Sequence, residues 1–435
     1  MSLSDAEQRV CDEIEGRREE LVALASDLIA FDTTAREVGD PPRQEAAMQE
    51  YLAARLSAAG AEIDLWEPDP DALQGKPLVP PGLDFAGRPQ LVARLRGSGG
   101  GRTLLFNGHI DVVSAEPREL WTSDPFAAEV RDGKLYGRGS CDMKGGIAAM
   151  VIAAEVLSGQ LAGDLLVATN TDEESSGAGG SAIVERGIRA DAGIVTEPTG
   201  FDVWVACRGS EYGVVRVPGR PGHAEIRQPD WRDGGAVNAI EKATVVIDAI
   251  RSLRAEWSSR EGLDHPYLSR PALLPTVAAA GEWPVTYPAA CDLTIAVMYV
   301  PAQGGADEVR REVEEWILRE TARDEWLAEH PPTFEWQPNG VSPLEIPESE
   351  PIVGVVREAT RDVGRPAGLA GLDSWYDGET YTNRAGIPSV GFGPPGLDRN
   401  GVGVAHTIDE HVPVDGLVAC AQALAVAAMR FCSHA

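Results

Sequence analysis

The segment Leu104–Val113, LLFNGHIDVV, indicates both the kind of sheet that this chain forms and where its polar site lies. Its first three residues predict a buried strand that breaks at Asn107-Gly108. His109 and Asp111 follow, and residues two apart in an extended segment project to the same side. An imidazole and a carboxylate that emerge together at a strand end favour a metal-ligating histidine whose tautomer and basicity are set by the carboxylate. For an isolated pair, a capped histidine is the alternative.

Two further apolar strands are expected, and each also ends in acidic residues. The strand over 165–169 precedes Thr171-Asp172-Glu173-Glu174, and the strand over 192–195 precedes Glu197. Between them and the opening strand, a glycine-rich loop with Asp142 leads into an alanine-rich helix over 147–157. Strands that alternate with helices predict a mostly parallel sheet, with ligands gathered along one edge.

The pattern of apolar and polar residues changes near Cys207, where strands of alternating polarity and two long helices indicate an α+β insertion. We therefore expect an α/β fold, with a catalytic domain from residues 1–206 and 341–435 and a smaller inserted α+β domain at 207–340. Single helices are expected over 4–29, over 44–59 and, at the end of the chain, over 414–430.

Composition excludes some partners. The net charge of −30 and the pI near 4.6 argue against nucleic acid and anionic membranes, which need a basic footprint. The N-terminus has no apolar leader segment, and no apolar run approaches the roughly 18 residues that would span a bilayer. The six cysteines are scattered, without metal-knuckle or disulfide spacing. We expect a cytoplasmic protein.

The candidate site collects polar residues from the strand ends. Two histidines and several carboxylates could hold two adjacent divalent ions if one carboxylate bridges them, and nitrogen and oxygen ligands without sulfur suit zinc, cobalt or manganese. The candidates are His109, Asp111, Asp142, Glu173, Glu174, Glu197 and His406.

The ordered set of motifs resembles a known family. GHIDVV, GRGSCDMKGG, TDEESSG, TEP, GRPGHAE and AHTIDEHVP look like the dinuclear-zinc amidohydrolases and peptidases that include acetylornithine deacetylase, succinyl-diaminopimelate desuccinylase, aminoacylase and glutamate-releasing carboxypeptidases. The resemblance covers nearly the whole chain. It implies hydrolysis of an amide bond in a small N-acylated substrate, with a di- or carboxypeptidase as the alternative.

The resemblance also implies roles for individual residues. Asp142 would bridge two ions, one held by His109 and Glu197 and the other by Glu174 and His406. A cis peptide would follow Asp142. Consecutive glutamates cannot both point at one ion, so one would be a ligand and its neighbour would be free for proton transfer. The resemblance implies that Glu174 is the ligand and that Glu173 is the general base, which takes a proton from a metal-bridging water. The insertion would make a homodimer and act as a lid, and it would bring His223 into the partner's site to stabilise the oxyanion.

Three observations bear on the substrate. Glu197 favours deacylation, because many true peptidases of the family carry Asp there. No arginine occurs in Ala296–Pro301, and Asp377-Gly378-Glu379 stands where relatives often have Asp-x-Arg. The substrate is therefore expected to lack the usual α-carboxylate or to carry an amine near Glu379, unless Glu379 faces solvent. Arg208 and Asn238 are weaker candidates for substrate contacts, and Asn238 could equally be a helix cap.

Two other classes of protein are open to the sequence. The glycines at 177–180 could indicate a nucleotide-binding oxidoreductase, but they lack the full fingerprint and follow an acidic stretch. A binding protein without activity would be expected to lack some of these ligands or the base, and none is missing.

Overall fold

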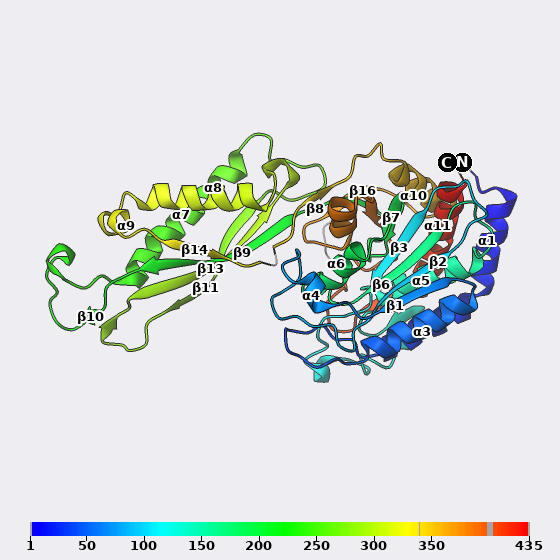
Figure 1. Cartoon of the computed structure of the whole chain (residues 1–435), viewed down its shortest axis with the longest axis horizontal. Coiled ribbons are helices and arrows are strands. Elements are labelled where there is room, and N and C mark those ends of the chain that lie inside the picture. The colour runs from blue at the N-terminus through cyan, green and yellow to red at the C-terminus, as the bar shows by residue number, and fades with distance from the viewer. Residues whose placement is uncertain (1, 339, 398–402, 434–435) are drawn as a thin grey trace. The chain divides into compact units, whose positions relative to one another are not determined.

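The computed structural model describes residues 2–338, 340–397 and 403–433, and it divides into two compact units (Figure 1). We call the first the sheet unit; it comprises Met1–Ala206, Leu344–Leu372 and Tyr376–Ala435. We call the second the inserted unit; it comprises Cys207–Pro343 and Asp373–Trp375.

One large sheet organises the sheet unit. Its strands follow the order β1-β2-β6-β3-β7-β17-β8-β15, and β16 pairs with β8. The pairs β3–β6, β3–β7 and β7–β17 are parallel, whereas β2 is antiparallel to β6. The expected mostly parallel α/β fold is thus confirmed. The strands are β1 Glu62–Trp66, β2 Gln90–Leu95, β3 Leu104–His109, β6 Leu165–Asn170, β7 Ala192–Val195, β8 Val203–Cys207, β15 Leu344–Glu345, β16 Leu369–Leu372 and β17 Ser389–Gly391.

β3 is the central strand of this sheet, and all its residues are buried. The expected break at Asn107-Gly108 is wrong, because β3 continues to His109. A buried polar side chain is tolerated when it is hydrogen-bonded. Asn107 Nδ2 donates to Asn170 Oδ1 at 2.8 Å and to the Tyr381 hydroxyl at 2.9 Å. Asn107 and Gly108 therefore continue β3 and do not end it, and His109 lies at the carboxyl end of the strand.

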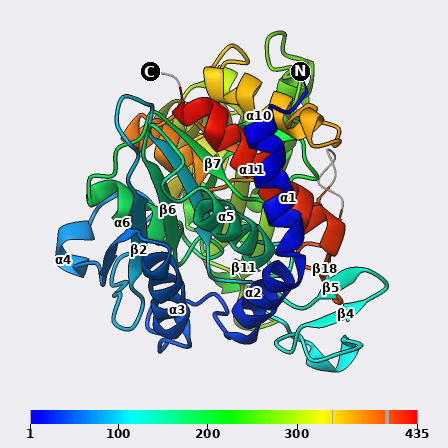
Figure 2. The same cartoon turned by 90° about the vertical axis from the view of Figure 1, so that its right-hand side faces the viewer.

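Helices cover the sheet. They are α1 Asp5–Gly16, α2 Arg18–Ala30, α3 Glu45–Ala58, α4 Pro70–Leu73, α5 Lys144–Val156, α6 Ala178–Glu185, α10 Pro351–Asp362 and α11 Val414–Cys432. The single helix expected over 4–29 is wrong, because the helix is interrupted at Arg17, the C-cap residue of α1. α5 is almost wholly buried and packs against α2 and α11 (Figure 2).

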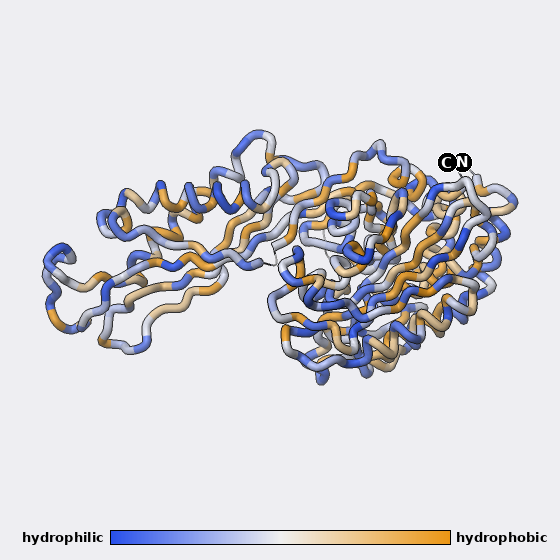
Figure 3. The backbone as a smooth tube through the Cα atoms, in the orientation of Figure 1, coloured by the Kyte–Doolittle hydropathy of each residue, from blue (hydrophilic) through white to orange (hydrophobic). Residues whose placement is uncertain are grey.

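α11 corrects the expectation that no apolar run is long enough to span a bilayer. Among the described residues it is the one helix long and apolar enough to cross a membrane by length and composition. That test is weak evidence, because a core helix also passes it, and 78% of the apolar window in α11 is buried. α11 packs against α1, α5 and α10. Figure 3 shows the apolar stretches running along the central strands and the helices that cover them.

The inserted unit is an antiparallel sheet with helices on it. The sheet has the order β11-β13-β9-β14, α7 packs on it, and α7 and α8 contact one another. A separate two-stranded ribbon pairs β10 with β12. The elements are β9 Gly209–Pro218, β10 Gly222–His223, α7 Ala239–Ser259, β11 Ala272–Ala280, β12 Thr286–Tyr287, β13 Ala290–Tyr299, α8 Ala306–Thr321, α9 Glu325–Glu329 and β14 Thr333–Trp336. A small sheet, β4 Glu129–Arg131, β5 Lys134–Tyr136 and β18 His411–Pro413, belongs to the sheet unit.

Candidate metal centre

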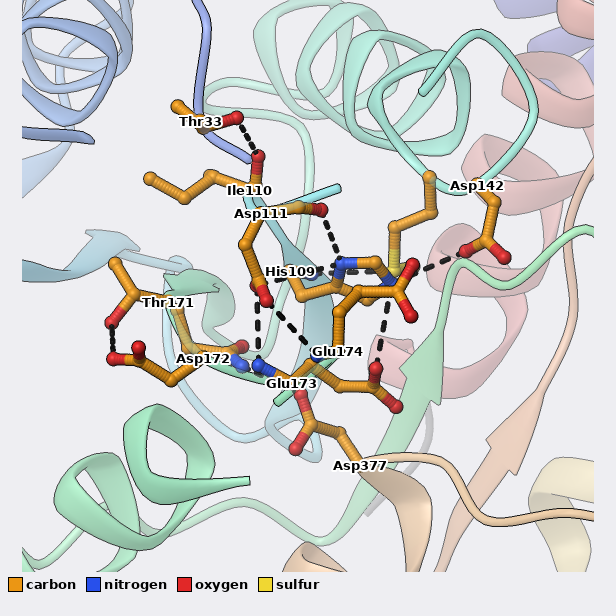
Figure 4. A network of polar contacts seen from close by, with 12 residues as sticks. Thr33, His109, Ile110, Asp111, Asp142, Thr171, Asp172, Glu173, Glu174 and Asp377 are labelled. Atoms are coloured by element: carbon orange, nitrogen blue, oxygen red, sulfur yellow. Dashed lines mark hydrogen bonds and ion pairs between the residues drawn. The ribbon is translucent and has the colours of Figure 1, made fainter. Parts of the chain in front are cut away.

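The carboxyl ends of parallel strands bring the predicted ligands together, and Figure 4 shows three of them, His109, Asp142 and Glu174. His109 is the last residue of β3, and Glu174 and Glu197 follow β6 and β7 within a few residues. Asp142 comes from the loop before α5, and His406 from the loop before β18. One nitrogen or oxygen atom from each of His109, Asp142 and Glu174 lies within 4.8 Å of the others.

Asp142 lies between the two histidines. Its Oδ1 is 3.2 Å from His109 Nε2, and its Oδ2 is 3.3 Å from His406 Nε2. His406 Nε2 is also 3.1 Å from Glu174 Oε1. The two oxygens of one carboxylate therefore face imidazoles from different segments, as a bridging ligand between two ions would.

Glu173 and Glu197 complete the cluster on the His109 side. Glu173 Oε2 and Glu197 Oε1 each lie 4.0 Å from His109 Nε2. Glu173 and Glu174 are consecutive, yet Glu173 approaches His109 and Glu174 approaches His406. This is the division expected if one glutamate binds an ion while its neighbour stays available for proton transfer.

Burial and crowding shift the pKa values of these groups. Burial, then the nearby charges, raises the pKa of Glu173 and of Glu197 well above the usual range. The hydrogen bonds to Asp142 and Glu174 raise the pKa of His406 to about 10. Burial alone would lower the pKa of His109, but the facing carboxylates raise it well above its ordinary value. The site thus gathers more negative charge than its own residues neutralise.

The residues present fit a divalent metal ion. A buried carboxylate oxygen needs a hydrogen bond or a cation. Glu197 Oε1 is buried, and within the described part of the chain no hydrogen-bond donor reaches it. The donor atoms are imidazole nitrogens and carboxylate oxygens, a set that suits zinc, cobalt or manganese. A cation between Glu197 and His109 would satisfy this oxygen.

The role expected for Asp111 needs a correction. His109 Nδ1–H donates to the backbone carbonyl of Asp111 at 2.9 Å, while the Asp111 carboxylate lies 3.7 Å from the same nitrogen. The carbonyl therefore fixes the tautomer and leaves Nε2 facing Asp142. The carboxylate instead accepts from the backbone amides of Glu173 at 3.2 Å and Glu174 at 2.9 Å. Asp111 thus holds the turn that carries both glutamates.

Sequence reasoning missed the role of Glu410. Its buried carboxylate accepts from Arg138 Nη1 at 2.7 Å and from the amides of Gly139, Cys141 and Asp142 at 3.1, 2.9 and 3.1 Å. Glu410 therefore shapes the loop that presents Asp142. Its place four residues after His406 in the DEHVP motif was the available signal. The cis peptide expected between Asp142 and Met143 is confirmed.

The weaker candidates lie in other settings. Asn238 Oδ1 accepts from Ile240 N at 3.0 Å and caps α7, so the helix-cap alternative is confirmed. Arg208 donates from Nη2 to the carbonyl of Asp373 at 2.8 Å, within the inserted unit. His223 is exposed on the β10–β12 ribbon.

Glu379 does not face solvent, because it is 1% exposed. Its Oε1 accepts from Asn383 Nδ2 at 3.1 Å, and its Oε2 lies 3.7 Å from Arg384 Nε. The solvent-facing alternative is therefore wrong.

Comparison with known proteins agrees with this geometry. The family model described as Peptidase family M20/M25/M40 matches residues 105–430. The chain is 31% identical over 422 residues to acetylornithine deacetylase of Myxococcus xanthus, covering 95% of this chain and 97% of the relative. It is 28% identical over 433 residues to N-formyl-4-amino-5-aminomethyl-2-methylpyrimidine deformylase of Halalkalibacterium halodurans, covering 93% and 92%.

Solved structures share the fold at lower identity. The aminopeptidase PepT from Bacillus cereus superposes with a TM-score of 0.68 at 18% identity, covering 95% of this chain and 98% of that one. The match to the family model spans every predicted ligand from His109 to His406, the residues that the fold gathers at one sheet edge. From the family match and this clustering we conclude that the chain belongs to Peptidase family M20/M25/M40 and is a hydrolase of that family.

Proposed function

We propose that the chain is a metal-dependent deacylase that hydrolyses the amide bond of a small N-acylated amine. The observation that carries the proposal is the position of Asp142 between His109 and His406, with Glu197 Oε1 buried and in need of a cation. Relatives named as a deacetylase and a deformylase, each matched over more than nine-tenths of both chains, support deacylation over peptide cleavage.

In this proposal His109 and Glu197 would hold one divalent ion, Glu174 and His406 would hold the other, and Asp142 would be a ligand to both. Bound ions would supply Lewis-acid polarisation of the acyl carbonyl and lower the pKa of the attacking water. Glu173 accepts the proton of that water and donates it to the leaving amine. Burial raises the pKa of Glu173, which makes its carboxylate a stronger base.

The substrate is proposed to lack an α-carboxylate. No arginine occurs over Ala296–Pro301, at the end of β13 and just after it, and Glu379 occupies the position where relatives often have arginine. The deformylase relative supports this, because its named substrate contains amino, aminomethyl and formyl groups and no carboxylate. The proposal rests on the absence of an arginine that would bind a substrate carboxylate. A direct contact between Glu379 and a substrate amine supports it less well, because Glu379 is buried beside Arg384.

A homodimer is proposed to complete the site. Strand β11 lies at the edge of its sheet, where Val277 is 56% exposed and residues 278–280 are also exposed. Exposed edge strands readily pair with another chain. His223 Nδ1 accepts from Glu225 N at 3.3 Å, which leaves Nε2 to donate to an oxyanion in the partner's site. A cytoplasmic location stays a prediction.

Metal analysis and a substrate panel test the proposal. The purified chain should bind about two zinc-like ions per chain, and a chelator should abolish activity that added metal restores. The panel compares the N-formyl aminopyrimidine, N-acetylornithine, N-succinyl-diaminopimelate and N-acyl amino acids with dipeptides. Faster hydrolysis of dipeptides would favour the alternative, a di- or carboxypeptidase. Rapid turnover of a carboxylate substrate that is lost in an Arg208 variant would refute the proposed absence of a carboxylate anchor.

A further inference from the structure

A short segment between α2 and α3 runs alongside the residues that follow His109. Thr33 Oγ1 donates to the carbonyl of Ile110 at 2.6 Å, as Figure 4 shows. The amide of Val112 donates to the carbonyl of Thr33 at 3.1 Å, and the amide of Ala35 donates to the carbonyl of Val112 at 2.8 Å. The segment is thus fixed to one of the loops that form the candidate metal centre.

The next residue of this segment, Arg36, reaches a second of those loops. Its Nε donates to Asp172 Oδ1 at 2.9 Å, and its Nη2 donates to the carbonyl of Asp84 at 2.5 Å. The side chains of Arg36 and Asp172 are each only 3% exposed. Thr171 Oγ1 donates to the other oxygen of Asp172 at 2.6 Å. A charged pair that is buried and hydrogen-bonded in this way fixes both partners tightly.

Asp172 has an unusual backbone conformation and directly precedes Glu173 and Glu174. Its φ is +64°, in the left-handed region that residues other than glycine seldom adopt. Its carbonyl accepts from the amides of Ser176 at 3.0 Å and Gly177 at 2.6 Å, which closes the turn behind the two glutamates. Such a conformation persists only where surrounding contacts determine it.

We propose that Arg36 is a positioning residue, which holds Asp172 in its left-handed conformation so that Glu173 and Glu174 point to different partners. Asp111 holds the same turn through the amides of Glu173 and Glu174. Arg36 thereby couples the His109 loop to the glutamate loop. The roles of the two glutamates rest on the proposed function.

A purely stabilising ion pair is the competing explanation, and the chain offers a matched control for it. Arg88 Nε lies 3.2 Å from Glu45 Oε1, and these side chains are 1% and 4% exposed. The Arg88 guanidinium also donates to the carbonyls of Asp40 and Pro41. It is as buried as Arg36 and, among the described residues, its guanidinium donates no hydrogen bond to the glutamate loop, although it lies close enough to interact electrostatically with Arg36 and Asp172. Arg88→Met should therefore lower stability and affect the turn less than Arg36→Met does.

The experiment compares the full chain with the variants Arg36→Met, Arg36→Lys and Arg88→Met. Hydrogen exchange is measured on the metal-free proteins, in a peptide that covers residues 171–178. In Arg36→Met the amides of Glu174, Ser176 and Gly177 should exchange at least about tenfold faster, with Arg36→Lys intermediate and Arg88→Met changed least. Arg36→Met with Asp172→Asn removes the carboxylate left unpaired and should recover stability but not this protection.

Cobalt binding gives a second readout. Removing a residue that orients ligands typically weakens metal binding by about 10- to 100-fold, so Arg36→Met should lose affinity for Co²⁺ and show a changed visible spectrum. Equal exchange and equal Co²⁺ binding in Arg36→Met and Arg88→Met would overturn the inference. A wild-type chain that takes up no Co²⁺ would instead refute the proposed metal centre, and the exchange data would still decide the role of Arg36.

Discussion

Two consecutive glutamates take different positions at the candidate metal centre. Glu174 Oε1 lies 3.1 Å from His406, whereas Glu173 Oε2 lies 4.0 Å from His109. The separation arises because the turn is held by its amides, both bonded to Asp111, so neighbouring side chains leave the backbone in different directions. Two chemically identical residues can therefore differ in function.

Replacing each glutamate by glutamine should separate these functions. Glu173→Gln should retain both ions but lower kcat by about 100- to 10,000-fold, because glutamine cannot carry the proton. Glu174→Gln should lose affinity for one ion, because a neutral amide is a poorer ligand than a carboxylate. Metal content and kcat, measured on the same samples, check both statements. Equal loss of metal in the two variants would contradict the assignment of Glu173 as base.

The sequence predicted the types of these residues better than their contacts. His109, Glu174 and Glu197 could be placed because each follows an apolar strand, and parallel strands end at a common edge. The contacts of Asp111 and Glu410 could not be predicted, because both carboxylates bind backbone amides. Every residue except proline has a backbone amide, so the sequence does not show which amides will bind a carboxylate. The direction of each N–H is set only when the loop folds.

At the scale of elements, α5 shows how closely a helix must approach the site. A Cβ atom added to Gly146 would lie 2.1 Å from the carbonyl oxygen of Thr196, the residue before Glu197. Alanine favours a helix over glycine by about 1 kcal/mol, but inserting a methyl group into a packed core costs about 1–3 kcal/mol. Here the neighbour is backbone and cannot move aside easily, so the overlap should prevail.

Gly146→Ala should therefore destabilise the chain by as much as about 2 kcal/mol and weaken metal binding by displacing Glu197. Gly354 in α10 is the matched control, because a Cβ added there would meet nothing within 4 Å. Gly354→Ala should raise stability by up to about 1 kcal/mol. Urea unfolding of both variants measures the difference. A stabilising Gly146→Ala would show that the helix is not pressed against this loop.

α1 is joined to α11 by an ion pair that should depend on pH. Arg430 Nε donates to Glu7 Oε1 at 2.6 Å, and the amide of Ser4 donates to Glu7 Oε2 at 2.7 Å. Although burial opposes the charge, these bonds lower the pKa of Glu7 below its ordinary value of 4.5. The folded state thus releases this proton more readily than the unfolded state. The stability gained is complete above about pH 4.5 and is lost as the pH falls through the folded pKa.

Glu7→Gln should consequently cost about 1.5–3 kcal/mol at pH 7, the value of a hydrogen bond to a charged group. The difference from the wild-type chain should shrink as the pH falls below 4.5, the ordinary pKa of this group. Urea unfolding at several pH values provides the measurement. A constant difference across this range would mean that Glu7 stabilises α1 through its cap on Ser4 and not through its charge.

At the scale of the whole molecule, the alternation of apolar strands and helices was enough to predict the mostly parallel sheet. Its buried strands β3 and β6 begin with continuous apolar runs, and helical stretches separate the strands. The break between α1 and α2 does have a signal in the sequence, because it follows Gly16 and glycine often marks the end of a helix. The apolar periodicity that continues from Val10 to Leu28 outweighed that signal in the prediction. Oligomeric state is harder still, since an exposed edge such as β11 identifies a surface that can pair and not the partner that occupies it.

Mixing two inactive variants would show whether the proposed dimer completes the site. His223→Ala and Glu173→Gln should each be nearly inactive alone. If His223 serves the partner's site, a mixed dimer has one site with Glu173 from one chain and His223 from the other. Random exchange makes half of the dimers mixed, each with one working site, so about a quarter of wild-type activity should return. Measuring kcat after mixing and subunit exchange tests this, and sedimentation confirms the dimer. If exchange occurs but no activity returns, His223 acts within its own chain or takes no part in catalysis.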